Sequence, residues 1–126
     1  AGAAAGELEE PVGLAWLDSS RLLVCDTANR RLQVLDREGR PLAAVALPEA
    51  WRDFYSRPQA LALDPERWLV TDAPARALWL VESGSARRIE LGPEGITPAG
   101  LARSGDTLFV ADLGGRVWAL GLAAPP

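Results

Sequence analysis

Short runs of apolar residues, separated by turn-forming residues, make up most of this chain. Residues 22–25 and 68–70 are apolar at every position. Asp, Ser and Gly, which tolerate the tight backbone conformations of turns, stand between such runs, as in residues 18–20 and 36–39. Strands that are apolar at every position need cover on both faces. The pattern therefore predicts an all-β fold in which several sheets pack face to face.

The predicted strands form three groups along the chain. The first group covers residues 13–17, 22–26, 32–36 and 41–47. The second group covers residues 60–63, 68–71, 78–81 and 86–91. The third group covers residues 100–103, 108–111 and 117–120. The tail after the third group is too short and too rich in proline for a fourth strand, so we expect an open sheet edge there.

Each group of strands contains the same motif, Val-x-Asp-x-x-x-Arg-x-apolar. The three copies place their aspartates and arginines at Asp26 and Arg30, Asp72 and Arg76, and Asp112 and Arg116. A second marker, Pro-x-small-Leu-Ala, precedes each copy and begins at residues 11, 58 and 98. A period of roughly 40 to 45 residues, with several short strands in each unit, is typical of a propeller blade.

The first copy resembles the consensus of the NHL repeat family. Pro-x-Gly-Leu-Ala at residues 11–15 is followed by Val-x-Asp-Thr-x-Asn-Arg-Arg-Leu-Gln-Val at residues 24–34. The resemblance extends over about residues 11–126, although the second copy has Ala60 in place of the glycine and the third copy shortens its opening turn. The resemblance implies a six-bladed β-propeller, whereas three blades are too few to close a ring. We therefore expect three blades of four-stranded antiparallel sheets, half of an NHL-type propeller, completed by a second chain.

These markers divide the chain into an N-terminal segment, residues 1–10, and an NHL-like repeat domain, residues 11–126. Within the domain we expect blades at about residues 11–47, 58–91 and 98–122, with an insertion at residues 48–57. The N-terminal segment is either a frayed tail or an outer strand, donated within the same chain or to another one. In the second case it would cover the open edge of the third blade.

The insertion gathers aromatic residues outside the repeat pattern. Trp51, Phe54 and Tyr55 have the spacing that places three rings on one face of a helical turn, and Arg52 lies among them. One interpretation is a loop that folds back over the blades as a plug. The other is an exposed recognition surface, because Trp, Tyr and Arg are enriched at binding hot spots.

The repeated aspartates have two interpretations. Three carboxylates on equivalent blades would suit a hard cation such as calcium in a central channel. A carboxylate that ends a strand also accepts hydrogen bonds from the backbone of the loop that follows. The arginine four residues later offers each aspartate a charged partner. Because Asp and Arg recur together in every blade, we expect structural pairs rather than a metal site or catalytic residues.

Other catalytic and binding signatures are missing from the sequence. The chain has no histidine, so it cannot build a Ser-His-Asp triad or a histidine-ligated zinc site, which also argues against the lyase-type NHL enzymes. Cys25 lies in an apolar strand and is expected to be an inert core thiol. Gly114 and Gly115 form a blade turn, and no phosphate-binding loop is present. The formal net charge of −4 argues against nucleic acid, and no apolar run is long enough to span a membrane.

Two classes of function fit these observations. A non-catalytic binding or scaffold module, paired as a homodimer that closes a six-bladed ring, would present loops to a protein or a small ligand without a cofactor. A metal-dependent propeller hydrolase or lactonase would use carboxylates around the channel. A fragment of a larger NHL protein, with its activity elsewhere, is a third explanation. We expect the binding module, from a GC-rich bacterial source because every basic residue is arginine, located in the cytoplasm or exported if the alanine-rich start is a mature N-terminus.

Overall fold

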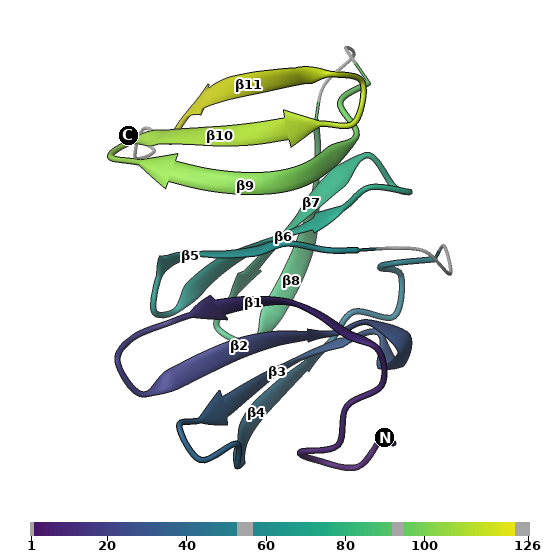
Figure 1. Cartoon of the computed structure of the whole chain (residues 1–126), viewed down its shortest axis with the longest axis vertical. Helices are drawn as coiled ribbons and strands as arrows, with labels where there is room; N and C mark the ends of the chain where they lie inside the picture. Colours follow the sequence, from purple (N-terminus) through teal and green to yellow (C-terminus); the bar gives the residue numbers. More distant parts are fainter. Residues whose placement is uncertain (1, 53–56, 92–94, 123–126) are drawn as a thin grey trace.

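The computed structural model describes residues 2–52, 57–91 and 95–122. Within these residues, eleven β-strands form three antiparallel sheets that follow one another along the chain (Figure 1). Blade 1 contains β1 (Pro11–Trp16), β2 (Arg21–Asp26), β3 (Arg31–Asp36) and β4 (Pro41–Ala46), with the short 3-10 helix η1 (Thr27–Asn29) after β2. Blade 2 contains β5 (Ala60–Asp64), β6 (Arg67–Asp72), β7 (Ala77–Glu82) and β8 (Ser85–Glu90). Blade 3 contains β9 (Pro98–Ser104), β10 (Thr107–Asp112) and β11 (Arg116–Gly121).

The predicted all-β fold is confirmed, and every predicted strand is found within two residues of its expected ends. Each sheet is a simple meander, in the orders β1-β2-β3-β4, β5-β6-β7-β8 and β9-β10-β11. Blades 1 and 2 have four strands, and blade 3 has three in the described residues. Among the described residues, β11 is paired on one side only, with β10.

The three blades are stacked face to face, with blade 2 in the middle (Figure 1). Trp68 and Val70 on β6 belong to the hydrophobic core that blade 2 shares with blade 1. Leu69, between them in the sequence, belongs to the core shared with blade 3, which also contains Leu108 and Val110 of β10. Since neighbouring side chains on a strand point to opposite faces, the central blade is covered on both sides. This double cover explains the uninterrupted apolar run of the sequence.

Gly13 in β1 is one position where only glycine fits. Its φ is +83°, in the left-handed region that side chains other than glycine rarely adopt. A Cβ atom built on it would lie 2.5 Å from the carbonyl oxygen of Pro58 and 3.1 Å from Sγ of Cys25. Gly13 therefore lets the first strand of blade 1 approach the chain where it enters blade 2.

We expect Gly13→Ala to lower the free energy of unfolding by about 3 kcal/mol, because left-handed strain and overpacking act together. Gly39 is a matched control, since its φ is also +83° and no atom lies within 4 Å of the place where its Cβ would stand. Gly39→Ala should cost only the backbone strain, about 1 kcal/mol. Urea denaturation of both variants measures the difference. Equal losses would show that the contact with Pro58 is not a real constraint.

Candidate functional site

The repeated aspartate ends the second strand of every blade and points toward the preceding side of the stack. Asp72 alternates with Trp68 and Val70, which face blade 1, and Asp112 alternates with side chains that face blade 2. Asp26 lies on the face of blade 1 that points away from blade 2. Asp26 and Asp72 are buried, whereas Asp112 is half-buried. The three carboxylates therefore lie on three separate faces and do not meet at one point.

Each of these carboxylates fastens the segment that leads into its own blade. In every case a backbone N–H of that segment donates to the carboxylate. The contacts are Glu9 N to Asp26 Oδ1 at 2.7 Å, Trp51 N to Asp72 Oδ2 at 3.2 Å, and Thr97 N to Asp112 Oδ1 at 3.1 Å. The repeated aspartate thus holds successive blades in order through their connections.

A second donor comes from the third strand of the same blade. It lies six or seven residues after the aspartate, as Gln33, Trp79 and Trp118. Their side-chain N–H groups donate to Oδ2 of the aspartate at 3.3, 2.8 and 3.1 Å respectively. Sequence reasoning missed these partners. A side chain with an N–H donor six or seven residues after the aspartate in each repeat was the signal that could have found them.

The structure does not bring the predicted Asp26 and Arg30 together. Arg31 is the partner of Asp26 across the β2–β3 ladder, and its Nε donates to Asp26 Oδ2 at 2.7 Å. Arg30 has a left-handed backbone, with φ +50°, and its carbonyl oxygen accepts a hydrogen bond from Leu47 N at 2.8 Å. The predicted pair is wrong by one residue, because η1 adds a turn before the ladder begins.

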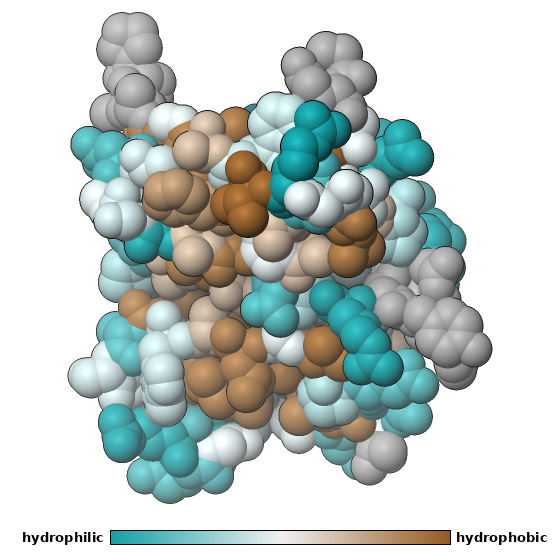
Figure 2. Space-filling model, turned by 45° about the horizontal axis from the view of Figure 1, so that its top comes forward, coloured by the Kyte–Doolittle hydropathy of each residue, from teal (hydrophilic) through white to brown (hydrophobic). Residues whose placement is uncertain are grey.

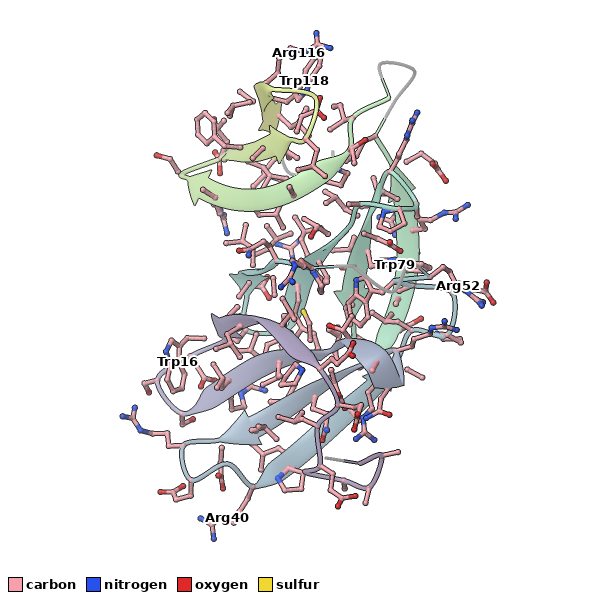
Figure 3. The ribbon with its side chains drawn as sticks, turned by 45° about the vertical axis from the view of Figure 1, so that its right-hand side comes forward. Trp16, Arg40, Arg52, Trp79, Arg116 and Trp118 are labelled. Carbon is pink, nitrogen blue, oxygen red and sulfur yellow. The ribbon has the colours of Figure 1, made fainter. Side chains whose placement is uncertain are left out.

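The other two predicted pairs also differ from expectation. Arg76 has a left-handed backbone, with φ +54°, and the donors to Asp72 are Trp51 and Trp79. Arg116 lies opposite Asp112 in the β10–β11 ladder. Its guanidinium stacks on the ring of Trp118, with 5.0 Å to the ring centre (Figure 3). In blades 2 and 3 an indole N–H therefore replaces the expected charged hydrogen bond.

Hydrogen bonds lower the pKa of two of these aspartates. Burial alone would raise the pKa of Asp26, but the bonds from Glu9 N–H and the Arg31 guanidinium hold it below its ordinary value. The backbone N–H of Gly114 does the most to lower the pKa of Asp112. Both side chains therefore stay ionised in the folded protein at neutral pH.

We expect the free energy of unfolding to fall as the pH drops below about 4. Several aspartates have lowered pKa values in the folded protein, among them Asp18, Asp26, Asp36, Asp64 and Asp112, with Asp18 at about 2. The folded chain then binds fewer protons than the unfolded chain near pH 3 to 4, so its stability is full above about pH 5 and is lost toward about pH 2. Urea titrations from pH 7 to pH 2.5 measure this, and constant stability down to pH 3 would contradict it.

The predicted recognition surface is not confirmed for its central residue. Trp51 is only 3% exposed, and its Nε1 donates to the carbonyl oxygen of Thr71 at 3.0 Å. Arg52 is exposed and pairs with Glu49 at 2.8 Å, and Figure 3 shows it pointing away from the blades. Phe54 and Tyr55 lie outside the described residues. Trp51 is therefore buried as a plug in the core that blades 1 and 2 share.

The described residues of the N-terminal segment, 2–10, contain no strand and lie beside blade 1 (Figure 1). The Arg31 guanidinium donates to three of their carbonyl oxygens, those of Ala3, Ala4 and Glu7. Glu9 also accepts a hydrogen bond from Ala28 N at 3.1 Å. In this structure the segment therefore lies against blade 1 and is not paired with β11 of the same chain, while its donation to another chain stays a prediction.

Further chemistry is limited in the described part of the chain. Cys25 is fully buried, and burial raises its pKa to about 12, so its thiol stays protonated. The described residues contain no group of three or more Cys, Asp or Glu side chains placed to hold a metal ion. They also contain no helix long and apolar enough to cross a membrane.

A cleft of about 640 Å³ lies between blades 2 and 3. Its walls are aliphatic and come from β6, β7 and β8 on one side and from β10 and β11 on the other. Three arginines and one aspartate also line it, namely Arg67, Arg87, Arg103 and Asp106. The volume lies in the range of ligand-binding pockets, which typically combine apolar walls with a few polar groups.

Both ends of the stack expose large hydrophobic side chains. On blade 1, Leu14 and Trp16 are 62% and 55% exposed. On blade 3, Phe109 and Val117 are 37% and 69% exposed. Figure 2, in which the end with blade 3 comes forward, shows brown hydrophobic residues among the hydrophilic ones on this surface. Exposed apolar side chains grouped in this way mark interaction surfaces.

The comparison with solved structures shows which fold this is. The virginiamycin B lyase from Staphylococcus aureus, in a catalytically inactive histidine-to-alanine form with quinupristin, aligns with 91% of this chain at a TM-score of 0.59 and 14% identity. A selenomethionine form of the same enzyme aligns at 0.60 and 16%, and a streptogramin B lyase at 0.60 and 13%. These enzymes are β-propellers. The fold of this chain is that of a partial β-propeller.

The chain spans only 41% to 42% of the length of these lyases. At 13% to 16% identity the likeness shows the fold alone. No family model matches the chain, and no curated protein matches it. The resemblance to NHL repeats thus stays a prediction, while the propeller architecture that it implied is confirmed.

Proposed function

We propose that this chain is a non-catalytic binding module of the propeller type, which pairs with a second copy to close a six-bladed ring. The observation that carries the proposal is the pair of exposed apolar faces at the two ends of a three-blade stack. A blade with one apolar face in water is destabilised relative to a blade that is covered on both faces. The ring would then present its loops and channel to a protein or a small ligand.

The two exposed faces are the two halves of an interface that already occurs twice inside the chain. The exposed face of blade 1 carries Asp26 and its incoming connection, as the face of blade 2 toward blade 1 carries Asp72. The exposed face of blade 3 is equivalent to the face of blade 2 that packs on blade 3. The exposed face of blade 1 is therefore complementary to the exposed face of blade 3. Neither face is complementary to a second copy of itself.

This arrangement sets the symmetry of the proposed ring. In a six-bladed propeller each blade takes roughly 60° of the circle, so three blades take roughly half of it. Two copies related by a twofold axis would place blade 3 of each copy against blade 1 of the other. The connection formed by residues 2–10 does not block this packing, because the connections into blades 2 and 3 occupy the same position at the interfaces that are already formed.

The proposal of a non-catalytic role rests on the lack of histidine in the sequence and on the hydrogen bonds of the three repeated aspartates. One of the similar lyases is described as catalytically inactive when a histidine is replaced, and this chain contains no histidine. The three repeated carboxylates of the alternative, a metal-dependent hydrolase, each accept a side-chain hydrogen bond from the third strand of their own blade. The geometry therefore favours a binding module over an enzyme.

Light scattering tests the proposal directly. We expect a solution mass of twice the chain mass of 13.4 kDa, independent of added metal. A monomer at all accessible concentrations would overturn the closed ring. A series of larger species would overturn it as well, because it would mean that the matching faces join without closing.

A further inference from the structure

The edge of blade 3 is built differently from the edges of the other two blades. In blades 1 and 2 the third strand is hydrogen-bonded on both sides, because β4 pairs with β3 and β8 pairs with β7. In the described part of the chain, β11 is hydrogen-bonded only to β10. One row of N–H and C=O groups along β11 is therefore available to another strand.

The cleft between blades 2 and 3 lies where that strand would place its side chains. At the interface between blades 1 and 2, the outer strand of blade 2, β8, packs Ala86 against the shared core. At the interface between blades 2 and 3, the corresponding space is lined by Leu80, Ile89 and Leu120 and remains open. An extended segment paired with β11 would fill it with every second side chain.

The charges around the cleft are concentrated at one end. Arg67 and Arg103 lie beside the β5–β6 and β9–β10 turns, and Arg103 donates to the carbonyl oxygen of Leu63 across the two blades. Arg87 begins the cleft-facing side of β8 near the same end. Asp106 is the one carboxylate among these lining residues. Arg67 is already paired with Asp64 at 2.7 Å, so Arg87 and Arg103 give the lining of this end its positive excess over Asp106.

We propose that β11 and this cleft bind an extended segment of a partner protein as the fourth strand of blade 3. The segment runs antiparallel to β11, as β4 and β8 run antiparallel to their neighbours. Since β11 ends at Gly121, beside the arginines, the bound segment begins there. Its chemistry follows: acidic residues at its N-terminal end and apolar residues at alternate positions after them. Main-chain hydrogen bonds provide affinity, and the cleft provides specificity.

A labelled synthetic peptide with the sequence Glu-Glu-Val-Thr-Leu-Thr-Val is the probe. The control peptide has the same residues in reverse order, so that its charge and composition are unchanged. We expect the first peptide to bind about tenfold more tightly in fluorescence anisotropy, because only it places both glutamates at the arginine end. Proline in place of the central threonine should abolish binding, because it removes an N–H from the new ladder.

Two variants of the protein locate the binding site. Arg87 and Arg88 are adjacent on β8 and both exposed, but Arg87 lines the cleft while Arg88 lies on the opposite face and pairs with Glu90 at 2.9 Å. Arg87→Glu should weaken peptide binding about tenfold, and Arg88→Glu should leave it within about twofold of the parent. Hydrogen exchange should show new protection of the β11 amides only when the peptide is bound.

Three results would overturn the proposal. They are equal affinity for the forward and reversed peptides, equal loss in the two arginine variants, and absence of added protection at β11. If Arg87→Glu does not fold, binding of the proline peptide to the parent protein is measured instead, and unchanged affinity would overturn the proposal. The cleft lies within a single chain, so the assay does not depend on ring closure. A protein that is monomeric by light scattering and still binds the peptide would refute the dimer and support this inference.

Discussion

Replacing Asp26 by alanine is expected to lower the free energy of unfolding by about 3 kcal/mol. The carboxylate is fully buried and accepts hydrogen bonds from Glu9 N, Asn29 Nδ2, Arg31 Nε and Gln33 Nε2. Alanine leaves these donors without their acceptor in a region of low water access, and an unpaired buried donor or charge is costly. Arg31 is partly exposed, so solvent recovers some of the loss.

The same substitution should also release residues 2–9 from blade 1. Hydrogen exchange of their amides and urea denaturation of the whole domain measure the two effects separately. Asp112→Ala is the matched control, because it removes the equivalent residue from a half-buried position with fewer donors. We expect a loss of about 1 to 2 kcal/mol there. If both variants lose the same stability, the burial of the carboxylate does not determine its contribution.

A charge on either end of the stack is expected to weaken dimer formation about a hundredfold. Val117→Glu places a carboxylate on the exposed face of blade 3, and Leu14→Glu does the same on blade 1. Burying an unpaired charge in a hydrophobic interface costs about 2 to 3 kcal/mol or more, which corresponds to about this factor in the dissociation constant. Each ring contains the substituted contact twice, so the hundredfold effect is a lower bound and either substitution alone is sufficient.

Sedimentation equilibrium over a range of concentrations measures the effect. Ser85→Glu is the control, because it adds the same charge at an exposed position of blade 2, whose two faces are covered within the chain. It should leave the dissociation constant within about twofold of the parent. A dimer that tolerates Val117→Glu and is lost with Leu14→Glu would mean that blade 1 pairs with blade 1, which contradicts the proposed ring.

The choice of residue for this experiment depends on the structure. Phe109 and Trp118 both belong to the terminal blade, but they are not equivalent probes of association. Phe109 faces outward, whereas Trp118 packs against the core between blades 2 and 3 and donates to Asp112. Trp118→Ala would therefore lower the stability of blade 3 itself. A changed dissociation constant in that variant would not show whether the exposed face of blade 3 takes part in the dimer.

Trp16 shows how polar groups accompany the exposed end of blade 1. The guanidinium of Arg37 stacks over its ring, with 5.6 Å to the ring centre, and Figure 3 shows Trp16 at the edge of the blade. Arg116 and Trp118 form a similar stack at the other end of the molecule. Such stacks keep part of an aromatic ring out of water in the isolated chain.

Local sequence patterns were enough to predict the strands and the three blades that the structure describes. These features depend on apolar runs, turn residues and a motif that recurs at a nearly constant period, and each is contained in a few consecutive residues. The burial of Cys25 followed from the same pattern, because residues 22–25 are apolar throughout.

The partners of the repeated aspartates and the exposure of the aromatic residues followed only from the packing of the blades. Asp26 receives its bond from Glu9, 17 residues earlier, and Asp72 receives its bond from Trp51, 21 residues earlier. The spacing around Trp51 left a plug and a recognition surface open, and the packing of blades 1 and 2 buries its ring. The cleft is lined by strands of blades 2 and 3, so its arginines come together only when the two blades pack. Contacts between distant segments depend on how whole sheets pack, and no local pattern in the sequence encodes that packing.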